Sequence, residues 1–215
     1  MKNSRSCTIY IVRHGETEWN KSHVVMGQKD SPLTELGIEQ AKTTATKLKD
    51  VNFDLIISSD LPRAYKTAEI IKSERPLIVE TSELLRERNY GHFQGRPKAE
   101  YKEATKLLSE AKKLLSEKEQ WKHKVSEDVE SDEEIVVRFM AYLKEIAILH
   151  PNKVILIVTH AGCIRTFLMR MGCFKYGELK SGNFQNAGHI KTVFNGTNFI
   201  VEEIVGVDKN AKGAE

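Results

Sequence analysis

Arg13, His14 and Gly15 directly follow the apolar run 9–12, and no turn-forming residue separates them from it. A buried strand that ends in these residues would hold a cation and an imidazole rigidly. The imidazole is suited to nucleophilic or acid–base chemistry, and the guanidinium beside it attracts anions. Taken alone, His14 is most simply a structural histidine at a strand end, hydrogen-bonded to the main chain. Other residues must therefore decide whether it has a functional role.

Three other polar residues are candidates to complete a site with His14. His160 ends a second apolar run, and Arg63 comes four residues after Ser59. Glu87 adds a carboxylate from a polar segment further along the chain. Two guanidinium groups and one histidine suit a doubly charged tetrahedral anion such as phosphate. The second histidine is then free for a role other than binding that anion.

Elements of two kinds alternate along the chain. Apolar, β-branched runs predict strands at 8–12, 55–58, 77–80 and 154–160. Apolar residues at helical spacing predict helices at 34–50, 62–72, 131–149 and 162–171. Two β-like runs, 189–195 and 198–205, predict a closing hairpin. This order predicts one three-layer α/β domain, with a mostly parallel sheet covered by helices on both faces.

The predicted sheet brings the polar residues together. Arg13 with His14, the serine pair 58–59 and His160 each come at the carboxyl end of a predicted strand. Ligands of open α/β sheets bind in the crevice at these strand ends. We therefore expect the three segments to meet in one crevice, with Arg63 turning into it from the start of the next helix.

The segment 98–130 is unusually rich in charge, with 16 charged residues of 33, eight of each sign. We expect a helical insertion at about 97–130 whose charges form a solvated face, with Pro97 in its first turn. Its apolar stripe is expected to comprise Tyr101, Ala104, Leu107 or Leu108, Ala111 and Leu115. The domain would span 1–207, followed by a disordered tail at 208–215.

Composition narrows the class of protein. The 33 basic and 30 acidic residues give a net charge of +3, which favours neither a nucleic acid nor a membrane surface as partner. No long apolar segment or export signal is seen. Three cysteines without CxxC spacing predict neither a disulfide framework nor a zinc site. We expect a cytoplasmic protein, either a monomer or a homodimer.

Five blocks of sequence resemble the histidine phosphatase superfamily, which contains phosphoglycerate mutases, fructose-2,6-bisphosphatase-like enzymes and broad small-molecule phosphatases. The blocks are VRHGETEWN, GQKDSPLTELGIEQA, SSDLPRAYKTA, LRERNYGHFQG and VTHAGCIR. They occur in the family's order and cover most of 8–97 and 131–170. A lone RHG triplet would be a weak signal, whereas five ordered blocks are a strong one.

The resemblance implies a role for each polar residue of the predicted crevice. His14 would be the nucleophile that forms a phosphohistidine. Arg13, Arg63 and His160 would hold the three phosphoryl oxygens and stabilise their charge in the transition state. Glu87 would protonate the departing alcohol and later take a proton from water. No metal ion or cofactor is implied, because the arginines supply the positive field.

A second set of residues is expected to bind the substrate, which would be a small phosphorylated metabolite. By the same resemblance these are Asn20, Gly27, Arg88, Tyr90, Lys98, Ala161 and Gly162. Asn20 would donate to the phosphate, and the residues after His160 would line the mouth with Gly27. Gly15 is expected to leave room for the approach to the nucleophile.

The choice between phosphatase and mutase activity depends on the positions at which this sequence differs from the mutase pattern. Mutases follow the lysine matched by Lys98 with an arginine pair for the substrate carboxylate, and this chain has Leu114 and Leu115 at that distance. Glu130 and Ser131 instead resemble the phosphatase version. We therefore expect a metal-independent phosphomonoesterase. A cofactor-dependent phosphoglycerate mutase is the second reading, and a non-catalytic phospho-ligand binding protein is the third.

Overall fold

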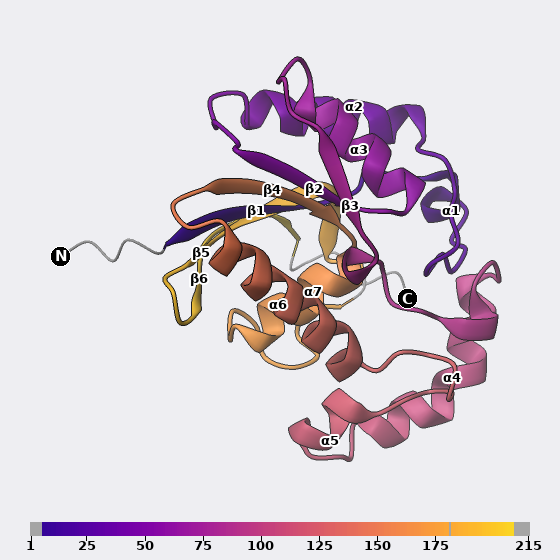
Figure 1. The fold of residues 1–215 in the computed structure, drawn as a ribbon. Helices are drawn as coiled ribbons and strands as arrows, with labels where there is room; N and C mark the ends of the chain where they lie inside the picture. Colours follow the sequence, from indigo (N-terminus) through magenta and orange to yellow (C-terminus); the bar gives the residue numbers. More distant parts are fainter. Residues whose placement is uncertain (1–5, 181, 209–215) are drawn as a thin grey trace.

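A computed structural model describes residues 6–180 and 182–208 of the chain. Its sheet has the strand order β3-β2-β4-β1-β5-β6 (Figure 1). The strands are β1 (Cys7–Arg13), β2 (Leu55–Ser59), β3 (Val79–Ser82), β4 (Val154–Thr159), β5 (Phe184–Phe194) and β6 (Phe199–Val207). The first four strands pair in parallel, whereas β5 runs antiparallel to β1 and β6 antiparallel to β5. The expected mostly parallel sheet is confirmed.

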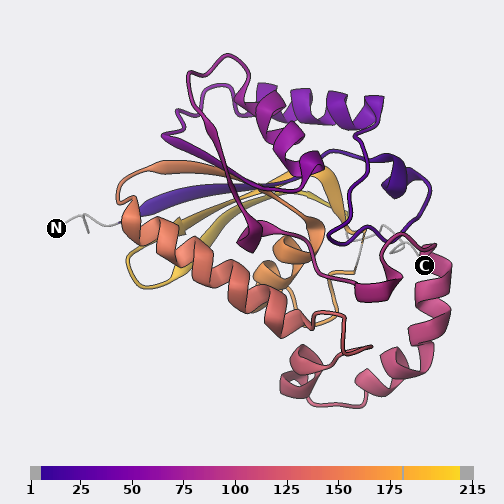
Figure 2. The same ribbon diagram turned by 45° about the vertical axis from the view of Figure 1, so that its right-hand side comes forward.

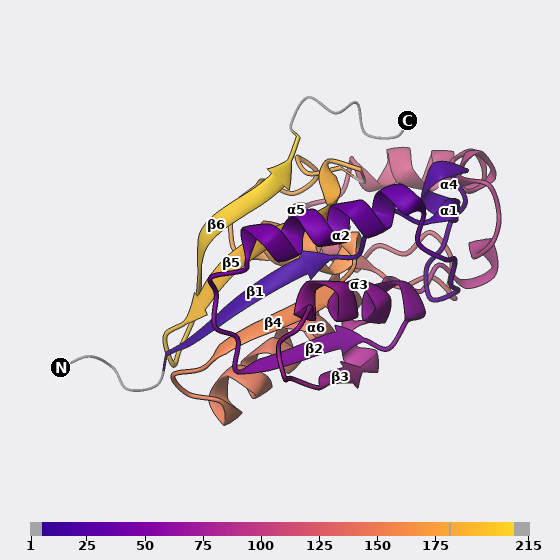
Figure 3. The ribbon, with the colours of Figure 1, turned by 90° about the horizontal axis from the view of Figure 1, so that it is seen from above.

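Helices cover both faces of this sheet, as expected. The helices are α1 (Glu18–Lys21), α2 (Glu35–Lys47), α3 (Pro62–Lys72), α4 (Lys98–Lys112), α5 (Glu117–Lys122), α6 (Asp132–Leu149) and α7 (Ala161–Arg170). Two short 3₁₀ turns, η1 (Glu83–Leu85) and η2 (Gly91–Phe93), lie in the connection after β3. Seen from above, α2 and α3 cross one face of the sheet (Figure 3), and α6 and α7 lie on the other (Figure 1). These are the three layers.

Capping residues in the sequence account for the first residues of α6 and α3. Ser131 caps α6 by accepting from the Glu134 N–H, and the Glu134 carboxylate returns a bond to the Ser131 N–H. This reciprocal capping box satisfies main-chain donors that have no partner within the helix. Pro62 occupies the first turn of α3, where its missing N–H costs nothing.

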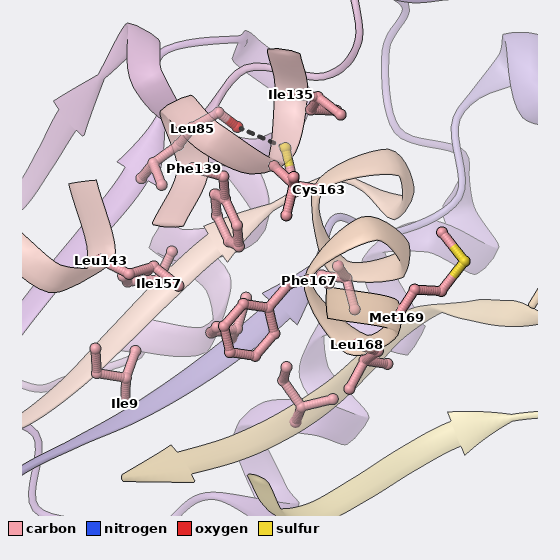
Figure 4. Packing of buried hydrophobic residues seen from close by; sticks show 14 of the residues in the cluster. Ile9, Leu85, Ile135, Phe139, Leu143, Ile157, Cys163, Phe167, Leu168 and Met169 are labelled. Atoms are coloured by element: carbon pink, nitrogen blue, oxygen red, sulfur yellow. Dashed lines mark hydrogen bonds between the residues drawn. The ribbon is translucent and has the colours of Figure 1, made fainter. Parts of the chain in front are cut away.

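The central strands are buried on both faces, which explains their unbroken apolar sequence. Ile9 and Ile11 of β1 pack toward α6 and α7 in one core cluster, together with Phe139 and Phe167 (Figure 4). Val12 packs in the second cluster, beneath α2 and α3. Because both clusters lie against β1, the end of this strand is held firmly, and His14 follows it immediately.

Two predicted strand positions are corrected by the structure. The strand expected at 77–80 lies two residues later, because Ile78 projects into solvent with 82% exposure and only Val79 begins the pairing with β2. The first strand of the closing hairpin starts earlier than residue 189, at Phe184. A register shift between Phe184 and His189 interrupts its regular alternation, so pattern alone does not reveal this start.

The apolar stripe expected for the helical insertion is wrong in part. Helices α4 and α5 do occupy this segment, but Leu107 is 79% exposed. Thr105 is the buried residue of α4, and Trp121 is that of α5. The reason is that α4 does not lie on the sheet. It extends beside the main body (Figure 2). Tyr101 packs on a small cluster formed by Val25, Phe93 and Val129.

The expected disordered tail, 208–215, lies outside the described residues except for Asp208, whose main-chain N–H donates to Asn183 O. Within residues 6–180 and 182–208, no helix is both long enough and apolar enough to cross a membrane.

Candidate active site

The ends of β1 and β4 place two histidines next to each other. These strands are parallel neighbours in which Arg13 pairs with Thr159, so the residues that follow also meet. The His14 N–H donates to the Thr159 carbonyl at 3.0 Å, and the ring centroids of His14 and His160 are 5.2 Å apart. The two apolar runs separated by most of the chain therefore end at one place, as the sheet prediction expects.

The ring of His14 is held as a neutral imidazole. Its Nδ1 lies 2.7 Å from the carbonyl oxygen of Gly15, which can only accept, so Nδ1 carries the proton. Burial, reinforced by the nearby Arg63 and Arg13 cations, lowers the pKa of His14 well below its ordinary value. A neutral ring with hydrogen on Nδ1 leaves a lone pair on Nε2. That nitrogen is available as a nucleophile.

Arg63, in the first turn of α3, is anchored by the segment that joins α1 to α2. Its Nη2 donates to Gly27 O at 2.6 Å, and its Nη1 donates to Lys29 O at 2.8 Å and to Asp30 Oδ1 at 2.9 Å. These bonds fix the guanidinium, which is 1% exposed, but they leave Nε without a partner. The side chain is therefore positioned while one donor remains unused.

Arg13 is buried in a similar way. Its Nη1 donates to the carbonyl of Phe184, and its Nε has no partner. Burial lowers the pKa of Arg13 to about 10, opposed by Glu87 and assisted by Arg63, so the group stays charged at neutral pH. A second buried cation thus faces the same space as Arg63.

Unpaired polar atoms concentrate at this place. Of the five buried side-chain nitrogens and oxygens that lack a partner in the described part of the chain, four belong to Arg13, Arg63 and His160. Leaving such a group unpaired costs about 1–3 kcal/mol. The two arginine Nε–H groups and the one N–H of a neutral His160 are donors beside a neutral imidazole, an arrangement that suits an oxyanion whose oxygens would accept from them.

Glu87 lies on the same cavity with its carboxylate oriented by main chain. Its Oε1 accepts from the Arg88 N–H at 2.7 Å, and its Oε2 accepts from the Gly162 N–H at 3.1 Å. The simpler alternative, in which the neighbouring arginines pair with it, does not occur. Arg86 binds Asp60, and Arg88 binds Asp132. The carboxylate is thus left without an arginine partner at the edge of the anion site.

The cavity itself has a volume of about 180 Å³. Of the residues expected from the sequence, it is lined by Arg13, His14, Asn20, Gly27, Arg63, Glu87, Tyr90, Lys98 and Ala161. Its remaining wall is largely apolar, formed by Val24, Val25 and Met26 with Tyr101. The cavity thus combines two buried arginine cations, a neutral imidazole and one carboxylate. This set of groups is suited to phosphoryl transfer.

Comparison with known proteins agrees with this geometry. The family model of the histidine phosphatase superfamily (branch 1) matches residues 9–205. The chain belongs to the histidine phosphatase superfamily. The resemblance predicted from the five sequence blocks is confirmed.

Individual relatives of this chain carry two kinds of description. A protein of Bacillus subtilis described as the uncharacterized phosphatase PhoE is 34% identical over 160 residues, which cover 74% of this chain and 75% of that protein. The probable phosphoglycerate mutase GpmB of Yersinia pestis is 47% identical over 89 residues, or 41% of each chain. A crystal structure of phosphoglycerate mutase from Bacillus anthracis superposes with a TM-score of 0.79 and 29% identity, covering 100% of this chain and 99% of that one.

Three of the expected residues are not among those that line this cavity. His160 is fully buried, and its ring centroid lies 5.2 Å from that of His14. Arg88 turns away to bind Asp132 and Glu130 O, so the expectation that it contacts substrate is not supported. Gly162 instead makes room for Glu87, because a Cβ there would come closer than 3.0 Å to the Glu87 carboxylate.

The reason expected for Gly15 is also corrected. A Cβ at Gly15 would meet the main chain of Gly37 in α2 at less than 3.0 Å. The missing side chain therefore permits α2 to pack closely on the catalytic loop rather than opening a path to His14. The Gly15 N–H donates to Thr67 Oγ1 of α3 at 3.1 Å, which adds a second helix to the support of this loop.

Asn186 is a site residue that sequence reasoning missed. Its Nδ2 donates to His14 O at 3.1 Å and lies 3.3 Å from Asn20 Oδ1. Because Asn20 Oδ1 also accepts from the Thr17 N–H, the Asn20 NH₂ is the group left to face substrate. No motif contains Asn186, and only the irregular start of β5 brings it to the site.

Proposed function

We propose that this histidine phosphatase is a metal-independent phosphomonoesterase that acts on a small phosphorylated metabolite through a phosphohistidine. The observation that carries the proposal is the neutral His14 ring, with its free Nε2, amid the unpaired donors of Arg13, Arg63 and His160. A phosphate group would satisfy those donors and present its phosphorus to the nucleophile.

In the first step, His14 Nε2 attacks phosphorus, so that a P–N bond forms while the bond to the alcohol oxygen breaks. The leaving oxygen takes the proton of Glu87, whose place on the cavity wall is held by the main chain of Arg88 and Gly162. Arg13 and Arg63 stabilise the charge on the transferring phosphoryl oxygens. The role that Mg²⁺ has in other phosphotransferases would be taken here by these two guanidinium groups.

In the second step, water attacks the phosphohistidine and its proton passes to Glu87. The P–N bond breaks, inorganic phosphate leaves, and both His14 and Glu87 return to their starting forms. His160 supports both steps as a neutral donor, because burial and the cation of Arg63 lower its pKa well below the ordinary value. The two chemical steps therefore use the same set of residues.

Cysteine chemistry is a poor alternative for this site. Cys163 lies in the first turn of α7, but burial raises its pKa to about 12, so its thiolate is not populated at neutral pH. We also propose a reducing, cytoplasmic location, because the sequence has an odd number of cysteines and no CxxC spacing.

Phosphoglycerate mutase activity is the second candidate. Tyr90 and Lys98 line the cavity, which favours it. Against it, Leu114 stands where a mutase-like arginine is expected, and this side chain is 89% exposed in the turn after α4. A mutase must also shield its phosphohistidine from water. We therefore propose hydrolysis, because mutase activity would require an arginine that this chain lacks at that position.

The first experiment measures hydrolysis of p-nitrophenyl phosphate in the presence of EDTA, followed by a panel of phosphometabolites with and without 2,3-bisphosphoglycerate. Turnover with EDTA supports the phosphomonoesterase. Phosphoglycerate isomerisation that depends on the bisphosphate and exceeds hydrolysis would replace it by the mutase. Binding of phosphate without turnover of any compound would make the protein a non-catalytic phospho-ligand binder.

A further inference from the structure

A second cavity of about 460 Å³ adjoins the proposed catalytic one. It is enclosed by the α4–α5 insertion, the start of α6 and the first half of α7, in the region where the insertion lies beside the main body (Figure 2). Tyr90 and Tyr101 line both cavities and pack edge to face with ring centroids 5.5 Å apart. These two rings therefore form a common wall.

The floor of the second cavity holds one buried carboxylate among three cations. Asp132 Oδ1 binds Arg88 and lies 2.8 Å from Arg165 Nη2, and Oδ2 lies 3.1 Å from Lys112 Nζ and accepts from the Tyr176 hydroxyl. A single negative charge thus faces three positive charges. Burial, with Arg88 and Arg165 nearby, lowers the pKa of Lys112 even though Asp132 opposes this shift.

The rim of the cavity adds further positive charges, and no carboxylate pairs with them in the described residues. Lys113 and Lys180 line the cavity, and neither forms an ion pair with a carboxylate in the described residues. Glu130 is the other acidic residue of the lining, but its carboxylate binds Arg138 at 2.9 Å. His123 also lines the cavity, and its buried Nε2 has no partner. Both the excess of positive charge and this unpaired nitrogen suit an anionic ligand.

We propose that this cavity is a second anion site, separate from the catalytic one, which binds a small anion of two or three negative charges. Lys113, Lys180 and the side of Lys112 away from Asp132 would contact its charged groups, and His123 Nε2 would supply a further hydrogen bond. Carboxylate and phosphate oxygens both suit these donors. The volume is enough for a compact tricarboxylate such as citrate.

Citrate titration by calorimetry at low ionic strength tests the site, because citrate carries no phosphoryl group that His14 could attack. Three proteins are compared: wild type, the double variant Lys113→Gln/Lys180→Gln, and the matched control Lys98→Gln/Lys102→Gln. Both double variants remove two positive charges, the first at the second cavity and the control at the catalytic cavity. Circular dichroism and the melting temperature establish that both variants fold like wild type.

We expect wild type to bind one citrate and the Lys113→Gln/Lys180→Gln variant to bind it at least about tenfold more weakly, as the loss of two charge-assisted contacts implies. The control should retain wild-type affinity within about twofold on the same scale. Turnover of p-nitrophenyl phosphate by the Lys113→Gln/Lys180→Gln variant should be unchanged without citrate. The proposal is overturned if citrate does not bind at millimolar concentration, or if the control loses affinity as much as the first variant does.

Discussion

Asn186 donates from Nδ2 to the main-chain oxygen of His14 at 3.1 Å, although the two residues are 172 positions apart in sequence. The next residue, Ala187, donates its N–H to the same oxygen at 3.3 Å and adopts a left-handed backbone with φ of 55°. Thr44 of α2 holds Ala187 O from the other side at 2.8 Å. The irregular start of β5 therefore fixes the main chain of His14, the proposed nucleophile, with backbone strain that the surrounding bonds compensate.

Replacing Asn186 by alanine should impair catalysis more than stability. The substitution removes one hydrogen bond to His14 and frees the amide of Asn20, so we expect kcat/KM for p-nitrophenyl phosphate to fall about 10- to 100-fold. The free energy of unfolding should fall by only about 1 kcal/mol. Gln185→Ala, at the exposed neighbouring position, is the control and should stay near wild type. Equal losses in both variants would show that Asn186 does not position the site.

His14→Ala should abolish turnover while the fold persists. The loss is expected to reach about 10⁴-fold or more, because no other group can form the covalent intermediate. Rapid quenching with a labelled substrate should trap acid-labile, alkali-stable phosphate on wild type and none on the variant. Label found on another residue of the wild-type protein would contradict the nucleophile assignment.

Glu87→Gln should reveal the acid through its dependence on the leaving group. An alkyl alcohol needs a proton to depart, whereas p-nitrophenolate leaves readily without one. We expect about 10²–10⁴-fold loss of kcat for alkyl phosphates and a much smaller loss for the aryl ester. Glu83→Gln, on the same connection but with a largely exposed carboxylate, should change neither rate. A uniform loss across leaving groups would remove the acid role from Glu87.

The buried histidines predict a fall in stability at acid pH. Burial, Arg63 and Arg13 lower the pKa of His14 well below its ordinary value of 6.5, and burial with Arg63 acts likewise on His160. Below that pH the unfolded chain takes up protons that the folded chain does not, so the free energy of unfolding decreases as pH falls. Above it these two groups contribute no pH dependence.

Denaturant titrations between about pH 7 and pH 5 test this linkage, since each unmatched proton contributes on the order of 1.4 kcal/mol per pH unit. His14→Asn should show a shallower decline than wild type because one such proton is gone. His150→Gln, at the end of α6 and distant from the site, should keep the wild-type slope. The same slope in all three proteins would mean that His14 is not held neutral.

Gly15→Ala should destabilise the fold through α2. The added methyl group would press on the Gly37 main chain, which cannot move without shifting the helix. We expect a loss of about 2–4 kcal/mol in the free energy of unfolding. Gly172→Ala is a useful comparison, because its φ is 73° but no atom lies within 4 Å of an added Cβ, so only about 1 kcal/mol should be lost. A smaller effect at Gly15 than at Gly172 would contradict the packing role.

The part of the fold that depends on local pattern was predictable. Continuous apolar runs identified β1, β2 and β4, since both faces of these strands are covered. The exposed face of α4 could not be predicted from the sequence. Apolar residues at helical spacing occur in α4 although this helix does not pack on the sheet. The predicted position of β3 was two residues too early. Leu77 and Ile78 have the side chains of strand residues, but they precede Val79, where the pairing of β3 with β2 begins.

The sequence by itself determined the family, because five ordered blocks resemble the histidine phosphatase superfamily and the family model matches residues 9–205. It also predicted that Arg13, His14 and His160 meet, because Arg13 ends β1 while His14 and His160 directly follow β1 and β4, which are parallel neighbours. Only the tertiary structure decided how those groups are held and which neighbours they have. Asn186 reaches His14, Thr67 supports Gly15, and Arg88 turns to Asp132 rather than to substrate. Such contacts join single polar residues far apart in the chain. They leave no periodicity in the sequence, because one hydrogen bond constrains one side chain rather than a repeated face.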